Sequence, residues 1–274
     1  MANGYLEDLF GLSGKTAVVT GGGGVLGGKM ALALAKAGAN VVIWDLTEEI
    51  GNKTVKLIKD ALGEKAQAIA MAVDCSSDDS TLDGFKAVHA KFGSCDILIN
   101  GAGGNRGKSP LTEVDMKTFE FVLRLNLVIG CMVPMKSYAK YCIENKIKGS
   151  ILNIASMAAH LALSGVWGYS AAKAAVMNLT KQAACELAPH GIRVNAISPG
   201  FFLAEQNKAL LVEDEKTGKL TARGQAVIAH TPFGRFGEPE ELQGAILLLV
   251  NNRAGSFITG VTLPVDGGYL VSNI

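Results

Sequence analysis

The stretch Thr16-Ala-Val-Val-Thr20, followed directly by Gly21-Gly-Gly-Gly24 and Val25-Leu-Gly-Gly28, sets the architecture of the chain. Its first five residues are the β-branched and small apolar residues of a buried strand. The glycines permit a tight turn, and the alanine-rich apolar run from Val25 to Lys36 predicts a helix. Such a turn leaves bare backbone N–H groups at the positive end of the helix, where phosphate groups can bind. The stretch therefore predicts the start of a βαβ unit with an anion site.

The same alternation of short apolar runs and longer amphipathic runs continues through the chain. Strands are predicted at residues 41–44, 68–73, 96–100, 150–154, 193–197 and 261–265, and helices after residue 47 and near 78–92, 115–145, 169–188 and 239–250. The apolar runs lack polar alternation, which is typical of strands covered on both faces. Seven strands separated by helices predict a doubly wound parallel sheet, in one Rossmann-type α/β domain over residues 1–274.

Residues 201–232 interrupt this alternation. They contain a charged, glycine-containing segment, residues 213–219, between Pro199-Gly200 and Thr231-Pro232. An insertion at the carboxyl end of a late strand is well placed to cover a ligand, so we predict a small lid there. The alternative is a solvated surface loop.

The composition excludes several classes of protein. The chain has 274 residues, 49% of them hydrophobic, with 26 Lys+Arg against 25 Asp+Glu. This hydrophobicity excludes a disordered chain, and the balanced charge argues against a nucleic-acid binder. The longest apolar run, Ala245 to Val250, falls far short of the ~18 residues of a membrane span, and the first ten residues lack the apolar core of a signal peptide. We therefore expect a cytoplasmic protein that binds neither nucleic acid nor membrane.

Metal chemistry is not expected. The five cysteines, at positions 75, 95, 131, 142 and 185, form no C-x-x-C pair, and the four histidines have no H-E-x-x-H spacing. Scattered thiols suit a reducing compartment, where most act as small core residues.

The glycine turn admits two interpretations. Gly23-x4-Gly28-Lys29-Met30 nearly matches a nucleotide-binding P-loop, but Met30 cannot ligate Mg²⁺, which counts against an NTPase. Asp45 favours a dinucleotide instead, because it follows the second predicted strand, where a carboxylate can accept hydrogen bonds from ribose hydroxyls. That carboxylate would repel a 2′-phosphate, so NAD is expected rather than NADP. Alone, Asp45 could equally be an N-cap of the next helix.

Tyr169-Ser-Ala-Ala-Lys173 places a phenol and an ammonium group on one helix face. The lysine is expected to lower the pKa of Tyr169 from ~10 toward neutral, where the phenol can exchange protons. Ser156, at the carboxyl edge of a predicted strand, could hydrogen-bond a reacting carbinol or carbonyl oxygen, although serines also end strands as turn formers. Asn126 is a polar residue within an apolar helix and needs a partner, which could be backbone.

Taken in order, Thr20-Gly21-x5-Gly27, Asn100-Gly-Ala-Gly103, Asn126, Ser156, Tyr169-x3-Lys173 and Pro199-Gly200 resemble the short-chain dehydrogenase/reductase family over essentially the whole chain. The resemblance implies that Tyr169 is the catalytic acid/base, Lys173 lowers its pKa, Ser156 polarises the substrate oxygen and Asn126 holds a water in a proton relay. It also implies a set of NAD-binding residues: Gly21, Gly23, Gly24, Val25, Leu26, Gly27, Asp45, Leu46, Asp74, Cys75, Asn100, Gly101, Ala102, Gly103, Tyr169, Lys173, Pro199, Gly200 and Phe202.

The chain departs from the family pattern at two positions. Val25 stands where the middle glycine of T-G-x-x-x-G-x-G is usual, which leaves the pyrophosphate contacts open. Gly101 replaces the second Asn of N-N-A-G. Neither departure touches the four catalytic candidates.

A closer resemblance suggests the substrate. The runs at 20–28, 101–105, 199–207 and 230–237 are similar to the family's D-mannonate oxidoreductase (fructuronate reductase) branch. Polar or charged side chains near the expected site suit a sugar acid, although each is as readily an exposed surface residue, and Phe201, Phe202 and Leu203 leave an apolar substrate open. The candidate substrate residues are Asn105, Arg106, Met157, Gln206 and Asn207, with Lys108, Arg223, His230 and Arg235 as further donors.

These features predict an NAD-dependent oxidoreductase that interconverts a secondary alcohol and a ketone on an open-chain sugar acid, best matched by D-mannonate and D-fructuronate. The alternatives are a gluconate 5-dehydrogenase or another polyol dehydrogenase, an acyl-carrier reductase, which Asp45 disfavours, and a dinucleotide-sensing scaffold without catalysis. Wide apolar faces on the helices near 115–145 and 169–188 favour an oligomer, and the family resemblance implies a homotetramer.

Overall fold

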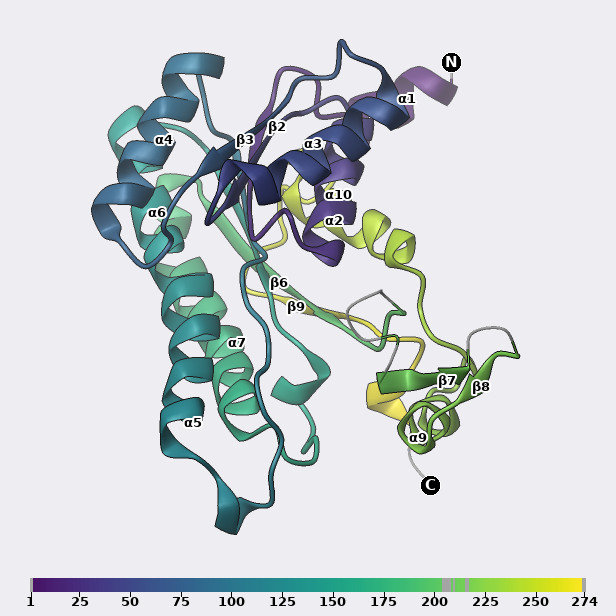
Figure 1. The fold of residues 1–274 in the computed structure, drawn as a ribbon. Coiled ribbons are helices and arrows are strands. Elements are labelled where there is room, and N and C mark those ends of the chain that lie inside the picture. The colour runs from purple at the N-terminus through teal and green to yellow at the C-terminus, as the bar shows by residue number, and fades with distance from the viewer. Residues whose placement is uncertain (1, 204–207, 209, 215–216, 273–274) are drawn as a thin grey trace.

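The computed structural model describes residues 2–203, 208, 210–214 and 217–272. Within these residues, seven parallel strands form the main sheet in the order β3-β2-β1-β4-β5-β6-β9 (Figure 1). The strands are β1 (Thr16–Thr20), β2 (Asn40–Asp45), β3 (Ala68–Ala72), β4 (Ile97–Asn100), β5 (Ser150–Ile154), β6 (Arg193–Pro199) and β9 (Thr262–Val265). This confirms the predicted doubly wound sheet, and each predicted strand boundary lies within two residues of the observed one.

Helices connect successive strands. They are α1 (Ala2–Phe10), α2 (Val25–Lys36), α3 (Glu48–Leu62), α4 (Asp78–Phe92), α5 (Met116–Leu123), α6 (Val133–Asn145), α7 (Trp167–Leu187), α9 (Ala222–His230) and α10 (Gln243–Val250). Side-chain caps fix several starts: Thr47 accepts from the backbone N–H of Ile50 at α3, and Ser77 accepts from that of Ser80 at α4.

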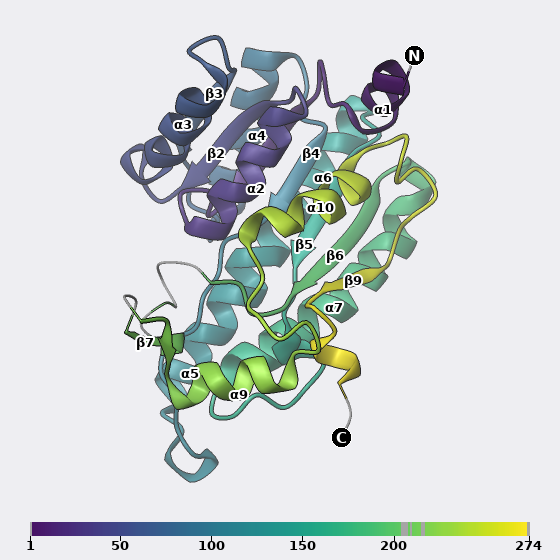
Figure 2. The ribbon, with the colours of Figure 1, turned by 90° about the vertical axis from the view of Figure 1, so that its right-hand side faces the viewer.

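Each face of the sheet has its own hydrophobic core. Ala17 and Val19 pack with α2, α3 and α10, whereas Val18 points the other way and packs with α4, α6 and α7. Figure 2 shows α2 and α10 in front of the sheet, with α6 and α7 behind it. Because both faces are covered, the central strands are apolar at successive positions, as the sequence indicates.

One continuous helix carries Asn126. The chain is α-helical from Met116, becomes a π-helix over Arg124–Met132 and returns to α-helix until Asn145. Among the described residues this helix is the one long and apolar enough to cross a membrane, and its most apolar window has a mean hydropathy of 1.5. It packs against α4 and α7 on one face of the sheet, which is the position of a connecting helix in a doubly wound α/β fold.

The insertion between β6 and α10 forms a small separate layer. Its described part contains the antiparallel strands β7 (Val212–Asp214) and β8 (Lys219–Leu220) and the helix α9 (Figures 1 and 2). The His230 ring at the end of α9 lies 4.5 Å from the Tyr269 ring, so the C-terminal segment packs against this layer. The predicted interruption of the alternation at 201–232 is therefore observed in its described part, and the role of this insertion as a lid stays a prediction.

Candidate active site

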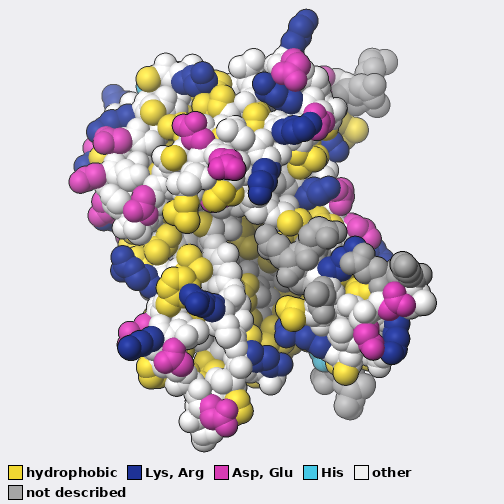
Figure 3. Space-filling model, in the orientation of Figure 1, with side chains coloured by type: hydrophobic (Ala, Val, Ile, Leu, Met, Phe, Trp, Pro, Cys, Tyr) yellow, Lys and Arg dark blue, Asp and Glu magenta, His cyan; other side chains and the backbone are white. Residues whose placement is uncertain are grey.

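A cavity of about 610 Å³ lies where β1, β2, β4 and β5 end, within the usual size range of a small-molecule site. This face of the molecule is hollowed between the main body and the insertion (Figure 3). The cavity wall contains most of the predicted NAD-binding residues: Gly21, Gly23, Gly24, Val25, Leu26, Gly27, Asp45, Leu46, Cys75, Gly101, Ala102, Gly103, Tyr169 and Lys173. Segments far apart in sequence therefore meet here because the carboxyl ends of parallel strands share one edge.

The glycine turn is shaped by close backbone packing. Gly21 has a φ of +61°, and a Cβ there would lie 2.7 Å from the Cα of Ala102. A Cβ on Gly27 would lie 2.5 Å from the carbonyl oxygen of Gly21. Helix α2 begins at Val25, and Gly24 gives it no side-chain cap, so the first N–H groups of the helix are left for another partner. Val25 is thus accommodated at the first helical position.

Lys29 has a partner that a P-loop lysine would not have. Its ammonium group lies 2.7 Å from a carboxylate oxygen of Glu240. This ion pair makes Lys29 unavailable to bind a phosphate group, which agrees with the sequence argument against an NTPase.

Asp45 is the last residue of β2 and lies next to the glycine turn. One of its oxygens accepts from the backbone N–H of Gly23 at 3.1 Å, and the other accepts from that of Leu46 at 2.9 Å. A carboxylate has lone pairs left after two such bonds, so it can still accept from the hydroxyls of a ribose. Among the described residues that line the cavity, Lys173 is the only basic one, and it lies with Tyr169 rather than with Asp45.

The wall contains residues that the sequence analysis missed. They are Met30, Trp44, Ile50, Val73, Gly104, Leu125, Ile129 and Ile154. Leu125 and Ile129 are spaced i,i+4 beside Asn126, a signal that could have placed them on its face. Met30, Ile50, Trp44 and Ile154 lie in helices or strands, whereas Val73 directly follows β3 and Gly104 lies in the loop after β4. Which of these residues reach the cavity depends on the tertiary packing.

Tyr169 and Lys173 lie on the same face of α7, as predicted from their spacing. The Lys173 ammonium is 5.6 Å from the centre of the Tyr169 ring and donates a 2.7 Å hydrogen bond to the Ile154 carbonyl oxygen. The Lys173 side chain is buried, and burial lowers its pKa to about 8.

The pKa of Tyr169 differs from the expectation. Burial raises this pKa above its ordinary value, and a side-chain hydrogen bond with Ser156 opposes the rise. The expected lowering by Lys173 is therefore not seen. The physical reason is that both groups are removed from water, which disfavours the phenolate and the ammonium alike.

Ser156 begins the short 3₁₀ turn Met157–Ala159 that follows β5. Its hydroxyl oxygen accepts from the backbone N–H of Ala158 at 3.2 Å. That bond occupies an acceptor site and leaves the hydroxyl proton to donate toward Tyr169 or a substrate oxygen.

Asn126 is fully engaged with backbone. Its Nδ2 donates to the carbonyl oxygens of Gly104 and Val122, and its Oδ1 accepts from the N–H of Gly104. The side chain therefore fixes the loop that leaves β4, which is the backbone-bridging role weighed for it in the sequence. A water relay at Asn126 stays a prediction.

Five predicted NAD-binding residues do not line the cavity: Asp74, Asn100, Pro199, Gly200 and Phe202. Asn100 is buried and donates to Asn153 on the neighbouring strand. Asp74 accepts from the N–H of Ser76, which lowers its pKa. The ring of Phe202 is buried against Gly237.

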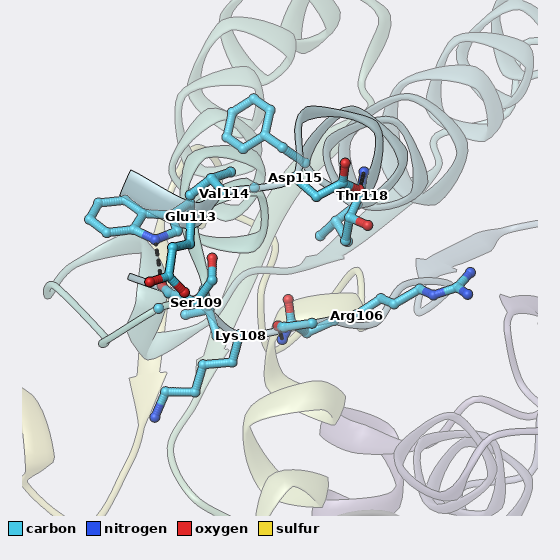
Figure 4. Close-up of a pocket in the computed structure, with 15 residues that line it drawn as sticks. Arg106, Lys108, Ser109, Glu113, Val114, Asp115 and Thr118 are labelled. Carbon is cyan, nitrogen blue, oxygen red and sulfur yellow. Dashed lines mark hydrogen bonds between the residues drawn. The ribbon is translucent and has the colours of Figure 1, made fainter. Parts of the chain in front are cut away.

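A second cavity of about 220 Å³ lies beside the start of α7 (Figure 4). Asn105, Arg106 and Lys108 line it, and the Trp167 indole donates to the Ser109 carbonyl oxygen across it. Figure 4 shows the Arg106 and Lys108 side chains extending in different directions.

The remaining described side chains predicted to bind substrate have other contacts in the structure, and Arg106 also contacts an aromatic ring. The guanidinium of Arg106 lies over the Phe121 ring, and Met157 is buried within its turn. Arg235 forms an ion pair with Glu241. Gln206 and Asn207 lie outside the described residues.

Similarity to known proteins agrees with this geometry. Residues 24–270 match the family model described as enoyl-(acyl carrier protein) reductase. The gluconate 5-dehydrogenase of Gluconobacter oxydans is 36% identical over 97% of this chain and 98% of its own length. A structure from Haemophilus influenza with bound NAD, provisionally named D-mannonate oxidoreductase, has a TM-score of 0.87 at 36% identity, covering 98% of this chain and 99% of that one.

A third similar protein carries the other dinucleotide. The gluconate 5-dehydrogenase of Burkholderia cenocepacia, solved with NADP and tartrate, has a TM-score of 0.86 at 34% identity, covering 98% of this chain and all of that one. The two solved structures share the fold of this chain, one with bound NAD and the other with NADP. Together with the ordered Ser156, Tyr169 and Lys173 motif, they identify the chain as a member of the short-chain dehydrogenase/reductase family, an oxidoreductase that acts on CH–OH groups.

Proposed function

We propose that this protein is an NAD-dependent oxidoreductase that interconverts D-mannonate and D-fructuronate. The observation that carries the NAD preference is Asp45, whose two oxygens are held by backbone N–H groups at the end of β2. A 2′-phosphate at this position would meet a carboxylate with no basic residue of the described cavity wall beside it. The sugar-acid class is supported by the gluconate dehydrogenases and the D-mannonate oxidoreductase among the similar proteins.

The residues present fit the cofactor. The uncapped start of α2 and the close-packed glycines would hold the pyrophosphate, and Asp45 would accept from the adenosine ribose. Lys173 donates one of its three hydrogens to Ile154, so the other two could reach the second ribose. Bound there, the nicotinamide supplies the hydride chemistry.

The chain's own residues would handle the proton. In the oxidation direction, the Tyr169 phenolate takes the proton of the substrate hydroxyl as the C–H bond breaks and the carbon becomes a carbonyl. Ser156 donates a hydrogen bond to that oxygen throughout, and Lys173 stabilises the phenolate by its charge. In the reduction direction, Tyr169 returns the proton to the oxygen.

The first experiment compares three substrates by NADH oxidation: D-fructuronate, 5-keto-D-gluconate and an acetoacetyl thioester. Rapid turnover of D-fructuronate, and slower turnover with NADPH than with NADH, is the expected result. Turnover of 5-keto-D-gluconate alone would instead establish the alternative that the two gluconate 5-dehydrogenases favour.

A second experiment tests the acid/base. Tyr169→Phe is expected to lower turnover at least a hundredfold, because it removes the hydroxyl that exchanges the proton, while the NADH dissociation constant changes less than threefold. A variant with more than a tenth of the wild-type rate would show that Tyr169 is not the acid/base.

We further propose one catalytic domain over residues 1–274, with the lid at 201–232, working as a cytoplasmic homotetramer. The assembly is supported by a largely apolar groove of about 430 Å³ between α6 and α7. Met132 and Ile143 are each 41% exposed along it. Exposed apolar grooves of this kind mark sites of association.

A further inference from the structure

The turn that carries Ser156 is a compact unit. Ala159 and His160 donate their backbone N–H groups to the carbonyl oxygens of Ser156 and Met157, each at 3.0 Å. His160 is the residue that ends the 3₁₀ turn, just as Ser156 begins it. Because these bonds close within the turn, a displacement of one end moves the other.

The turn is attached to β6 at both of its ends. Before it, the backbone N–H of Ala155 donates to the Ile197 carbonyl oxygen at 2.8 Å. After it, Nε2 of the His160 imidazole lies 2.8 Å from the hydroxyl oxygen of Ser198, a fully buried residue in the next position of β6. The second attachment is made by side chains alone.

Ser198 leads directly into Pro199-Gly200, where β6 ends. A Cβ on Gly200 would lie 2.6 Å from the Cα of Asp266, and the N–H of Gly200 donates to the Val265 carbonyl oxygen. This end of β6 is therefore held firmly against the segment that follows β9. Asp266 also faces His160, where its charge partly offsets the lowering of the imidazole pKa by burial.

We propose that His160 is a positioning residue, which holds the Ser156 turn at a fixed distance from the carboxyl end of β6 through its hydrogen bond to Ser198. The proposal rests on the catalytic role proposed above for Ser156. Ser156 and the substrate carbon must keep a constant geometry toward the nicotinamide, and misplacement by about 1 Å can cost as much as 10²-fold in rate. Loss of the bond is therefore expected to lower kcat with little effect on dinucleotide affinity.

Three variants separate the hydrogen bond from packing. The amide nitrogen of His160→Gln can occupy the position of the imidazole Nε2, whereas the shorter His160→Asn cannot reach Ser198. Ser198→Ala removes the other partner of the same hydrogen bond, and it deletes only the hydroxyl oxygen. His160→Asn and Ser198→Ala are each expected to lower kcat about tenfold, with KM for NADH within twofold of wild type, and His160→Gln is expected to keep at least half of the wild-type kcat.

The double variant His160→Asn/Ser198→Ala completes a double-mutant cycle with the two single variants and the wild type. If the two side chains act through one bond, kcat of the double variant equals that of either single variant, whereas independent effects multiply. Wild-type kcat in Ser198→Ala, equal losses in His160→Gln and His160→Asn, or multiplied losses in the double variant would each overturn the proposal. Melting temperatures of all four proteins show whether a loss comes from unfolding.

The same series distinguishes the proposal from the function on which it rests. The assays use whichever sugar acid the wild-type enzyme turns over, so a different substrate leaves the test intact. Turnover that survives Ser156→Ala would contradict the catalytic role of Ser156, whereas an inactive Ser156→Ala beside a fully active Ser198→Ala would contradict only the positioning by His160.

Discussion

At the scale of single residues, the lysine proposed to stabilise the Tyr169 phenolate is held in an unfavourable environment. Lys173 is buried, donates to one backbone carbonyl group and has its pKa lowered from 10.5 to about 8. The unfolded chain therefore binds more protons than the folded one between pH 8 and pH 10.5, so stability rises with pH across this window. Below pH 8 the full cost of burying the charge is present.

Replacement of this lysine should therefore stabilise the protein while it abolishes turnover. Lys173→Met is expected to raise the melting temperature at pH 7 by about 3 °C, because it removes a buried charge whose cost exceeds the gain from one hydrogen bond. The difference from wild type should shrink as the pH approaches 10. Melting curves from pH 7 to pH 10 measure it, and a variant less stable than wild type at every pH would contradict the buried-charge argument.

At the scale of elements, the sequence predicts the helices and strands whose bounds depend on local patterns. It misses features that depend on tertiary contacts. The strand at 150–154 and the helix at 78–92 have the predicted bounds because apolar runs and the Ser77 cap define them locally. The π-helix over Arg124–Met132 has no such signal, since its residues suit an α-helix equally. It brings Gly130 against the Ala102 carbonyl oxygen and Asn126 against Gly104, contacts that only the folded chain defines.

The same limit applies to the candidate site. Spacing alone predicts that Tyr169 and Lys173 share a helix face and that Asp45 lies at a strand end, although only the ordered set of motifs marks them as site candidates. The sequence gives no comparable rule for Phe202, which turns away to pack on Gly237. Nor does it show that burial raises the pKa of Tyr169 against the opposing hydrogen bond with Ser156, because desolvation depends on every segment around the group.

The close approach of Gly130 in the π-helix to the Ala102 carbonyl oxygen predicts that dinucleotide affinity is sensitive to a larger residue at this position. Gly130→Ala would place a methyl group against the Ala102 carbonyl oxygen and push the loop 101–104 into the dinucleotide cavity, so we expect NADH affinity to fall about tenfold. Gly244→Ala is the matched control, because a Cβ on this helical glycine meets nothing within 4 Å. The control should keep its NADH affinity and gain about 0.5–1 kcal/mol of stability. Fluorescence titration with NADH compares the two, and equal affinities would show that the contact is relieved without consequence.

At the scale of the whole molecule, the long helix from Met116 to Asn145 is apolar on more faces than one sheet requires. Only 33% of its most apolar window is buried, although it packs against both α4 and α7. The exposed remainder continues into the groove between α6 and α7, where Lys136 and Lys140 lie beside Glu144 and Glu186. Lys136 is ion-paired with Asp78 and Lys140 with Glu144 within the same chain. A second copy related by a two-fold axis would therefore bury the apolar strip while these lysines keep their partners.

This arrangement predicts that one charge in the groove disrupts the assembly. Ile143→Glu would bury a carboxylate in the apolar strip. We therefore expect light scattering at micromolar concentration to give a four-chain mass for the wild type and a smaller mass for this variant. Phe257→Glu is the control, because Phe257 is fully exposed and lies outside the groove. Since the Ile143 side chain lies away from the dinucleotide cavity, NADH binding should survive in both variants. A wild-type monomer, or an Ile143→Glu variant with unchanged mass, would show that this groove is not the interface between copies of the chain. The exposed apolar face of the helix would then need another partner.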